Sequence, residues 1–245
     1  MFGSPKIAPS LLSADFMDAG RDVSRLERAG ADWMHVDVMD GHFVPNLTMG
    51  VPYVRDLRPR TDLTIDAHLM VSNPTRQIPW YADAGADVIT VHVEAYMEGD
   101  DGRSSDGWTE LLLRDIEAMR SGGARPAVAI KPRTPTSVLG DLVAEVDMVL
   151  VMSVEPGFSG QGYIDGSEDR VAAVVAMAEE RGASPLVQVD GGIDPSTAPL
   201  VSSRGADVLV SGSYVLRAKD PRKAMDAIRK ASSVRPSGAQ PMASA

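Results

Sequence analysis

The sequence predicts a single (β/α)₈ TIM barrel, and three observations support this fold. The chain has 245 residues, a typical length for one such barrel. Short apolar, β-branched runs alternate with amphipathic segments, as in a parallel α/β fold. Residues 149–152 are apolar without alternation, which is typical of a strand covered on both faces. The predicted strands are residues 6–10, 33–39, 63–70, 88–94, 126–131, 147–153, 186–190 and 207–212.

The segments between these runs supply the helices and a short repeat. Amphipathic patterns predict helices that include residues 21–29, 111–120, 171–181 and 222–231. The tripeptide Gly-Ala-Asp precedes three of the predicted strands, beginning at Gly30, Gly85 and Gly205. Glycine suits the end of a helix, where a left-handed backbone is needed. The repeated unit is therefore one helix, one turn and one strand, which favours one catalytic barrel domain over residues 1–231.

Two segments differ from this pattern. Residues 96–110 hold five acids, one arginine and three glycines, so we expect an exposed acidic loop inserted after the fourth strand. Residues 232–245 are rich in serine, alanine and proline, and we expect a disordered tail.

The composition excludes several classes of protein. Lysine and arginine number 24 against 34 acids, a net charge of −10, which disfavours nucleic-acid binding. The absence of cysteine excludes disulfides, thiolate metal sites and thiol nucleophiles, and fits a reducing cytoplasm. The sequence contains neither a signal-peptide pattern nor an apolar run of about 18 residues. We therefore expect a cytoplasmic protein without a membrane partner.

Polar side chains with metal-binding chemistry occur near the ends of three predicted strands. His35 and Asp37 alternate on one strand and so share a face. His68 lies two residues before the end of a second run, and Asp190 ends a third. Barrel enzymes keep their chemistry at these strand ends. Imidazoles and carboxylates would bind one divalent cation, with zinc, iron, manganese and cobalt all possible. The alternative is that the histidines are satisfied core residues and the aspartates cap helices.

Neighbouring residues on the same faces extend this prediction. Met39, Met70 and Met152 lie at strand ends and could form an apolar collar around a reacting carbon, or could simply fill the core. Ser10 could donate a hydrogen bond to a substrate hydroxyl, or could cap a helix.

Glycine-rich loops follow the last three predicted strands. Glycines let backbone N–H groups approach an anion, and barrels often bind phosphate at their last loops, although tight turns also require glycine. These loops contain no lysine or arginine, so the donors would be backbone amides. Lys131, which ends the fifth strand, is interpreted as a surface residue. The loop residues are Gly157, Phe158, Ser159, Gly160, Gly191, Gly192, Gly212 and Ser213.

Taken together, these motifs resemble those of the ribulose-phosphate 3-epimerases over residues 6–231. The signature is residues 35–46, HVDVMDGHFVPN. Further blocks match at residues 66–70, 151–161 and 189–192, and the opening residues 7–16 are also similar.

The resemblance implies a ribulose-phosphate-binding barrel that interconverts D-ribulose 5-phosphate and D-xylulose 5-phosphate in the pentose phosphate pathway. By resemblance, His35, Asp37, His68 and Asp190 would hold the metal, and Asp37 and Asp190 would be the acid and base. Inverting a carbon beside a carbonyl requires a proton to leave one face and return on the other. Ser10 and His68 would contact the sugar and the glycine loops its phosphate. The family commonly forms homo-oligomers, which we also expect here.

Two departures and three alternatives complete the prediction. The acidic segment 96–110 is longer than the usual connection, and Ser159 stands where glycine is common. An epimerase of another phosphosugar, such as D-allulose 6-phosphate, would use the same residues. A decarboxylase or aldolase on a related phosphate-binding barrel is a second alternative. An aldolase of the Schiff-base kind would need a buried lysine, for which Lys131 is the candidate. A silent phosphosugar-binding protein is the third alternative.

Overall fold

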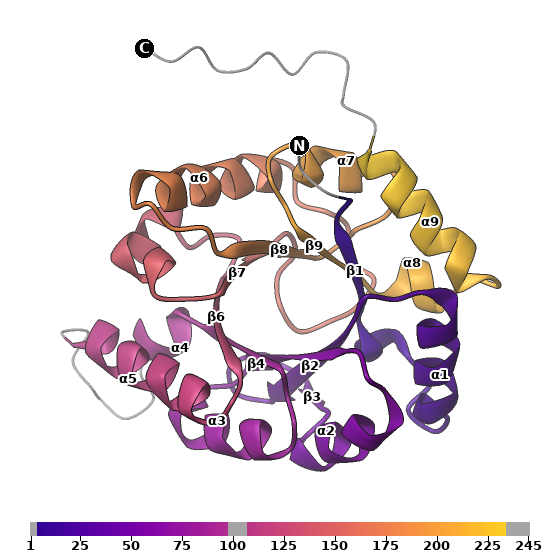
Figure 1. Cartoon of the computed structure of the whole chain (residues 1–245), viewed down its shortest axis with the longest axis horizontal. Coiled ribbons are helices and arrows are strands. Elements are labelled where there is room, and N and C mark those ends of the chain that lie inside the picture. The colour runs from indigo at the N-terminus through magenta and orange to yellow at the C-terminus, as the bar shows by residue number, and fades with distance from the viewer. Residues whose placement is uncertain (1–3, 98–106, 234–245) are drawn as a thin grey trace.

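The fold is a closed barrel of eight parallel strands surrounded by helices, as Figure 1 shows for the computed structural model, which describes residues 4–97 and 107–233. Neighbouring parallel strands pair in the order β1-β9-β8-β7-β6-β5-β4-β2. A parallel bridge between Ser10 and His35 joins the first and last of these and closes the ring. This confirms the predicted barrel. Its strands are β1 Lys6–Pro9, β2 Trp33–Asp40, β4 Thr64–Met70, β5 Val88–His92, β6 Arg125–Ile130, β7 Met148–Met152, β8 Leu186–Asp190 and β9 Val208–Ser211.

Several predicted strands ended too late in the sequence. Ser10, Lys131 and Gly212 lie just past their strands, and Glu94 begins a helix. A ninth strand, β3 (Leu47–Thr48), was not predicted, because two residues are too few to show a period. It pairs antiparallel with the end of β2.

The four predicted helices are present, with ends shifted by a few residues. Additional short helices fill the remaining connections and include several proline-containing segments that the amphipathic pattern did not reveal. The α-helices are α1 Ala19–Ala29, α2 Val51–Leu57, α3 Pro74–Asp83, α4 Glu94–Met97, α5 Trp108–Ser121, α6 Ser167–Glu180, α7 Ala198–Ser202, α8 Ser213–Leu216 and α9 Pro221–Ser232. Short 3₁₀ segments are η1 Leu11–Ser13, η2 Arg58–Arg60 and η3 Thr136–Ala144.

The predicted acidic loop, residues 96–110, is wrong at both ends. Tyr96 belongs to α4 and is buried, because its hydroxyl donates a hydrogen bond to Asp115 Oδ2 at 2.6 Å and ties α4 to α5. Residues 108–110 form the first turn of α5. Residues 98–106 lie outside the described residues. The predicted tail does too from residue 234 onward, whereas Ser232 still belongs to α9.

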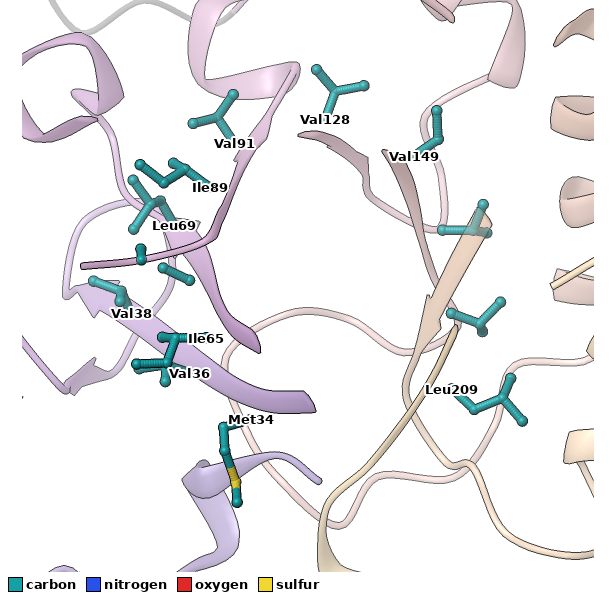
Figure 2. Packing of buried hydrophobic residues seen from close by; sticks show 14 of the residues in the cluster. Met34, Val36, Val38, Ile65, Leu69, Ile89, Val91, Val128, Val149 and Leu209 are labelled. Carbon is teal, nitrogen blue, oxygen red and sulfur yellow. The ribbon is translucent and has the colours of Figure 1, made fainter. Parts of the chain in front are cut away.

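Alternation along the strands separates two cores. Figure 2 shows Met34, Val36 and Val38 from β2 among the buried side chains that pack on the helix side of the sheet. A smaller apolar cluster lies at the amino end of the barrel strands and includes Trp33 and Met148. These two residues lie an even number of positions from the inward-facing residues of their strands, so they also point into the barrel. This arrangement reserves the carboxyl end for polar side chains.

The Gly-Ala-Asp repeat has a structural role that the sequence did not reveal. Gly30 ends α1 with a left-handed φ of 90°, as predicted, and the two equivalent glycines also have positive φ. Each aspartate then accepts a hydrogen bond from a backbone N–H on a neighbouring strand. The pairs are Asp32 Oδ2 with Ile7 N at 2.8 Å, Asp87 Oδ2 with Ile65 N at 2.8 Å and Asp207 Oδ2 with Val187 N at 2.9 Å.

We predict that Asp207→Ala lowers the free energy of unfolding by about 1–3 kcal/mol, because the N–H of buried Val187 loses its acceptor. Asp207→Asn keeps an acceptor oxygen and should cost clearly less. Urea denaturation of the two variants measures the difference. Equal destabilisation of both would show that the hydrogen bond does not carry the effect.

Candidate active site

Three strands deliver four metal-type ligands to one point inside the carboxyl end of the barrel. His35 and Asp37 come from β2, His68 from β4 and Asp190 from β8. One ligand atom from each residue lies within 4.8 Å of those from the other three. Both histidines are fully buried, Asp37 is 3% exposed, and the Asp190 side chain is 16% exposed. The alternative of separate core histidines and capping aspartates therefore fails.

The orientation of His35 follows from its hydrogen bonds. Its Nδ1 lies 2.7 Å from Oδ2 of Asp66, a fully buried aspartate on β4. Asp66 also accepts a hydrogen bond from Nε2 of Gln188 at 2.7 Å. Because Oδ2 of Asp66 acts as the acceptor in both contacts, Nδ1 of His35 donates a proton to it. A bound cation would take the place of any proton on Nε2. That Nε2 is buried without a hydrogen bond and lies 3.3 Å from Asp37 Oδ1 and 3.7 Å from Asp190 Oδ2.

The two carboxylates of the cluster have opposite protonation preferences. Burial, followed by the negative charge of Asp37, raises the pKa of Asp190 to about 7. Burial also disfavours the anion of Asp37, but His35 and His68 outweigh it and lower its pKa. Paired carboxyl groups with separated pKa values are suited to act as acid and base.

The histidines show the same competition between burial and charge. Burial alone would lower the pKa of His35, but the carboxylates of Asp37 and Asp66 raise it well above its usual value. For His68, burial prevails and lowers the pKa, favouring the neutral ring that binds metals.

The donor set fits a divalent transition metal. The buried Nε2 of His35 lacks a hydrogen-bond partner, and Nδ1 of His68 lies 3.2 Å from Asp37 Oδ1 and 3.9 Å from Asp190 Oδ2. Two imidazoles and two carboxylates are suitable ligands for zinc, iron, manganese or cobalt. Buried carboxylates are costly unless a charge compensates them, and a divalent cation would do so.

A cavity of about 240 Å³ opens beside this cluster. Asp37 and Asp190 reach its wall, whereas His35 and His68 lie beneath it. None of the described residues that line it is a lysine, arginine or histidine. The predicted substrate-contacting residues on its lining are Ser10, Met39, Met70, Met152, Gly157, Phe158, Ser159, Gly160, Gly191, Gly192, Gly212 and Ser213.

The glycine loops form one side of this cavity. Gly191 has φ of 126°, and a Cβ there would lie 2.6–2.8 Å from atoms of Val154. Gly192 has φ of 62°, and its Cβ would approach the backbone nitrogen of Tyr163 to 2.5 Å. Only glycine fits both positions, so the backbone can come close to a bound anion.

Ser10 caps a helix, which confirms one of its two predicted roles, and its contact with a substrate hydroxyl stays a prediction. Its hydroxyl donates to Asp37 Oδ2 at 2.5 Å, and its oxygen accepts the N–H of Leu12 at 3.3 Å, which caps η1. Ser159, at the position where the related motifs carry glycine, makes a 2.6 Å hydroxyl contact with Ser13. Its side chain therefore ties two loops at the rim together.

Several polar residues that lie beneath the cluster were not predicted from the sequence. Asp66 and Gln188 support His35, and His92 lies against His68 with 2.9 Å between their Nε2 atoms. The available signal was strand parity, since Asp66 shares a strand face with His68 at a separation of two residues. Lys131, the aldolase candidate, is half-buried with Nζ 3.9 Å from the Phe43 ring centroid and lies outside the lining of the cavity.

Sequence comparisons identify clear relatives. A family model described as "Ribulose-phosphate 3 epimerase family" matches residues 6–216. The ribulose-phosphate 3-epimerase of Bacillus subtilis is 43% identical over 225 residues, covering 91% of this chain and 98% of that protein. Its counterpart in Rhodobacter capsulatus is 46% identical over 215 residues, covering 87% of each chain.

Solved structures share the fold at lower identity. KGPDC from Streptococcus mutans in complex with D-R5P has a TM-score of 0.69 and 16% identity, covering 94% of this chain and 98% of that chain. The 3-hexulose-6-phosphate synthase from Salmonella typhimurium has a TM-score of 0.63 and 21% identity, covering 93% and 98%. These likenesses support the barrel fold alone. No helix among the described residues is long and apolar enough to cross a membrane.

Proposed function

The chain belongs to the ribulose-phosphate 3-epimerase family, and we propose that it interconverts D-ribulose 5-phosphate and D-xylulose 5-phosphate. The observation that carries this proposal is the convergence of Asp37 and Asp190 at one cavity, beside two histidines that complete a metal-ligand set. An epimerisation beside a carbonyl needs these two elements: paired acid–base groups and a means of stabilising negative charge.

The cation would be held by His35, Asp37, His68 and Asp190. When bound, it would stabilise negative charge on the substrate oxygens beside C3, a contribution that carboxylates with ordinary pKa values near 4 cannot make alone. Zinc, iron, manganese and cobalt all accept imidazole and carboxylate ligands of this kind.

Asp37 and Asp190 would move the proton. They approach the cavity from β2 and β8, which β1 and β9 separate in the barrel wall. We propose that one removes the C3 proton from one face of the sugar while the other returns a proton to the opposite face of the enediolate. Since the reaction is reversible, the two exchange roles when its direction changes.

The remaining lining residues would bind and orient the sugar. Met39, Met70 and Met152 are almost fully buried and would shield the reacting carbon from water. The phosphate would bind backbone N–H groups of the loops that contain Gly157–Gly160, Gly191–Gly192 and Gly212–Ser213. A backbone site is consistent with the absence of basic side chains from the described lining. Ser10, which lines the cavity, is proposed to contact the sugar directly. His68 is also proposed to contact the sugar, from its buried position beneath the cavity wall.

The alternative substrate, the alternative chemistry and the assembly of the protein are also proposals. D-allulose 6-phosphate is a less favoured substrate, because the curated relatives reported above are named for the pentose phosphate. The Schiff-base alternative is weakened by the position of Lys131 outside the cavity lining. We also propose a homo-oligomer that acts in the cytoplasm, within the pentose phosphate pathway, without a nucleic-acid or membrane partner.

The direct test is an epimerase assay. Purified protein should convert D-ribulose 5-phosphate to D-xylulose 5-phosphate, lose this activity after chelation, and regain it with one of the four candidate metals. kcat/KM should exceed that for D-allulose 6-phosphate by about tenfold or more, because the cavity must reject an additional carbon. Turnover of neither sugar by the metal-loaded protein would refute the proposal.

We predict that Asp37→Asn and Asp190→Asn each lower kcat by about 10³-fold or more, because each removes a group that transfers a proton. Circular dichroism should confirm that both variants remain folded. Asp141→Asn, at a surface acid that pairs with Arg181, serves as a control and should keep wild-type kcat. Full turnover in either active-site variant would exclude the two-base assignment.

In D₂O, solvent deuterium should enter the sugar at C3, because the carboxyl groups exchange with solvent between turnovers. Mass spectrometry and proton NMR of the recovered pentose phosphates would locate the label. If epimerisation proceeds for many turnovers without any incorporation, proton transfer through exchangeable carboxyl groups is wrong.

A further inference from the structure

A chain of buried polar groups runs away from the metal-ligand cluster and has no place in the proposed reaction. Nε2 of His68 lies 2.9 Å from Nε2 of His92, and Nδ1 of His92 lies 3.1 Å from Oε2 of Glu94. His68 and His92 are completely buried, and Glu94 is 4% exposed. The rings of the two histidines stack with their centroids 5.0 Å apart.

The Glu94 end of this series of buried groups is held by a backbone N–H and a hydroxyl group. Oε1 of Glu94 accepts the backbone N–H of Lys131 at 2.7 Å and the hydroxyl proton of Thr134. Nη2 of Arg170 in turn donates to the carbonyl oxygens of Lys131 and Thr134, at 2.9 and 2.8 Å, and holds this turn. Burial favours a neutral Glu94, but the hydrogen bonds of His92 and this turn outweigh it and hold its pKa at about 2. Oε2 is therefore a pure acceptor facing His92.

The positions of the protons follow from this acceptor. Nδ1 of His92 must carry a proton, because it faces Oε2 of Glu94 at 3.1 Å, and a neutral His92 then presents a bare Nε2 to His68. His68 must then carry its proton on Nε2 and donate it to His92. This leaves Nδ1 of His68 as a lone pair directed at Asp37 Oδ1, 3.2 Å away.

Counting protons shows why this arrangement suits a bound cation. The series Asp37–His68–His92–Glu94 contains three contacts between neighbouring side chains. In each contact two lone pairs face each other, so a proton or a cation is needed between them. Two neutral imidazoles supply two protons, which fill the His68–His92 and His92–Glu94 contacts. A cation between Asp37 and His68 fills the third, and all the groups are satisfied.

We propose that Glu94, acting through His92, positions the proton of His68 so that Nδ1 of His68 is available to the metal. Glu94 and His92 are thus positioning residues for the metal site, comparable to Asp66 for His35. The inference rests on the proposed function only through the ligand set, and it needs no sugar substrate to be tested.

Glu94→Gln is the diagnostic variant, because its amide can bind the turn in only one orientation. The amide oxygen must face the N–H of Lys131, which places the amide NH₂ against Nδ1 of His92. His92 would then have to accept at Nδ1 and donate from Nε2, and His68 would carry its proton on Nδ1, against the metal. Thr134→Val is the matched control, since it touches the same carboxylate but leaves Oε2 and its charge in place.

The probe is Zn²⁺ on the full chain, with its affinity measured by competition against a chromophoric chelator. Glu94→Gln should bind Zn²⁺ about 10- to 100-fold more weakly than wild type, the usual effect of losing a residue that orients a ligand. Thr134→Val should stay close to wild type. Unchanged affinity in Glu94→Gln would overturn the proposal.

Nitrogen-15 NMR of labelled histidine supplies the second readout, since the chain contains only four histidines. In the Zn²⁺-loaded wild type, His68 should be protonated at Nε2 and His92 at Nδ1, and Glu94→Gln should move both protons. If Glu94→Gln binds Zn²⁺ more weakly while the protons of His68 and His92 stay in place, the loss is due to the missing charge of Glu94. That result would overturn the proposed positioning of the His68 proton. If Glu94→Gln does not fold, the wild-type spectrum alone tests the proposal. A His68 that is protonated at Nδ1 in the Zn²⁺-loaded wild type would overturn the proposal. Zinc binding without epimerisation in the presence of any of the four candidate metals would refute only the proposed function.

Discussion

The structure depends on finding partners for the ionisable groups that are buried inside the barrel. An unpaired carboxylate or imidazole in this interior would cost several kcal/mol, a large share of the stability of one domain. Asp66 meets this constraint by accepting from His35 and Gln188, and Glu94 by accepting from His92 and the turn after β6. Among the described residues of the metal-ligand cluster, Nε2 of His35 has no hydrogen-bond partner and faces Asp37 and Asp190, where a bound cation would supply the compensating charge.

Strand parity determines how the fold can support this polar cluster. On β2, alternate residues such as Met34 and Val36 face the helices and supply the apolar packing. The residues that alternate with them, His35 and Asp37, face the inside of the barrel. Stability and chemistry are thereby assigned to opposite faces of the same strand. A substitution on the outer face changes packing without changing the ligands, whereas a register shift of one residue would exchange the two faces and destroy both.

Much of this could be predicted from local sequence. The eight strands follow from short apolar runs, the end of α1 at Gly30 from its backbone requirement, and the metal-type cluster from His35, Asp37, His68 and Asp190 at strand ends. The errors also have physical causes. Tyr96 was placed in an acidic loop because its neighbours are acidic, but its hydrogen bond to Asp115 draws it into the core. The short strand β3 exists only through its pairing with β2.

The sequence by itself determined the barrel, its four metal-type ligands and its glycine loops, because periodicity and residue chemistry are local properties of the chain. Only the tertiary structure decided which nitrogen of each histidine is free. That choice depends on partners distant in the chain: Asp66 lies 31 residues from His35, and the turn that fixes Glu94 lies about 40 residues beyond it. Proton positions follow from hydrogen-bond partners in space, and no local pattern of residues specifies those partners.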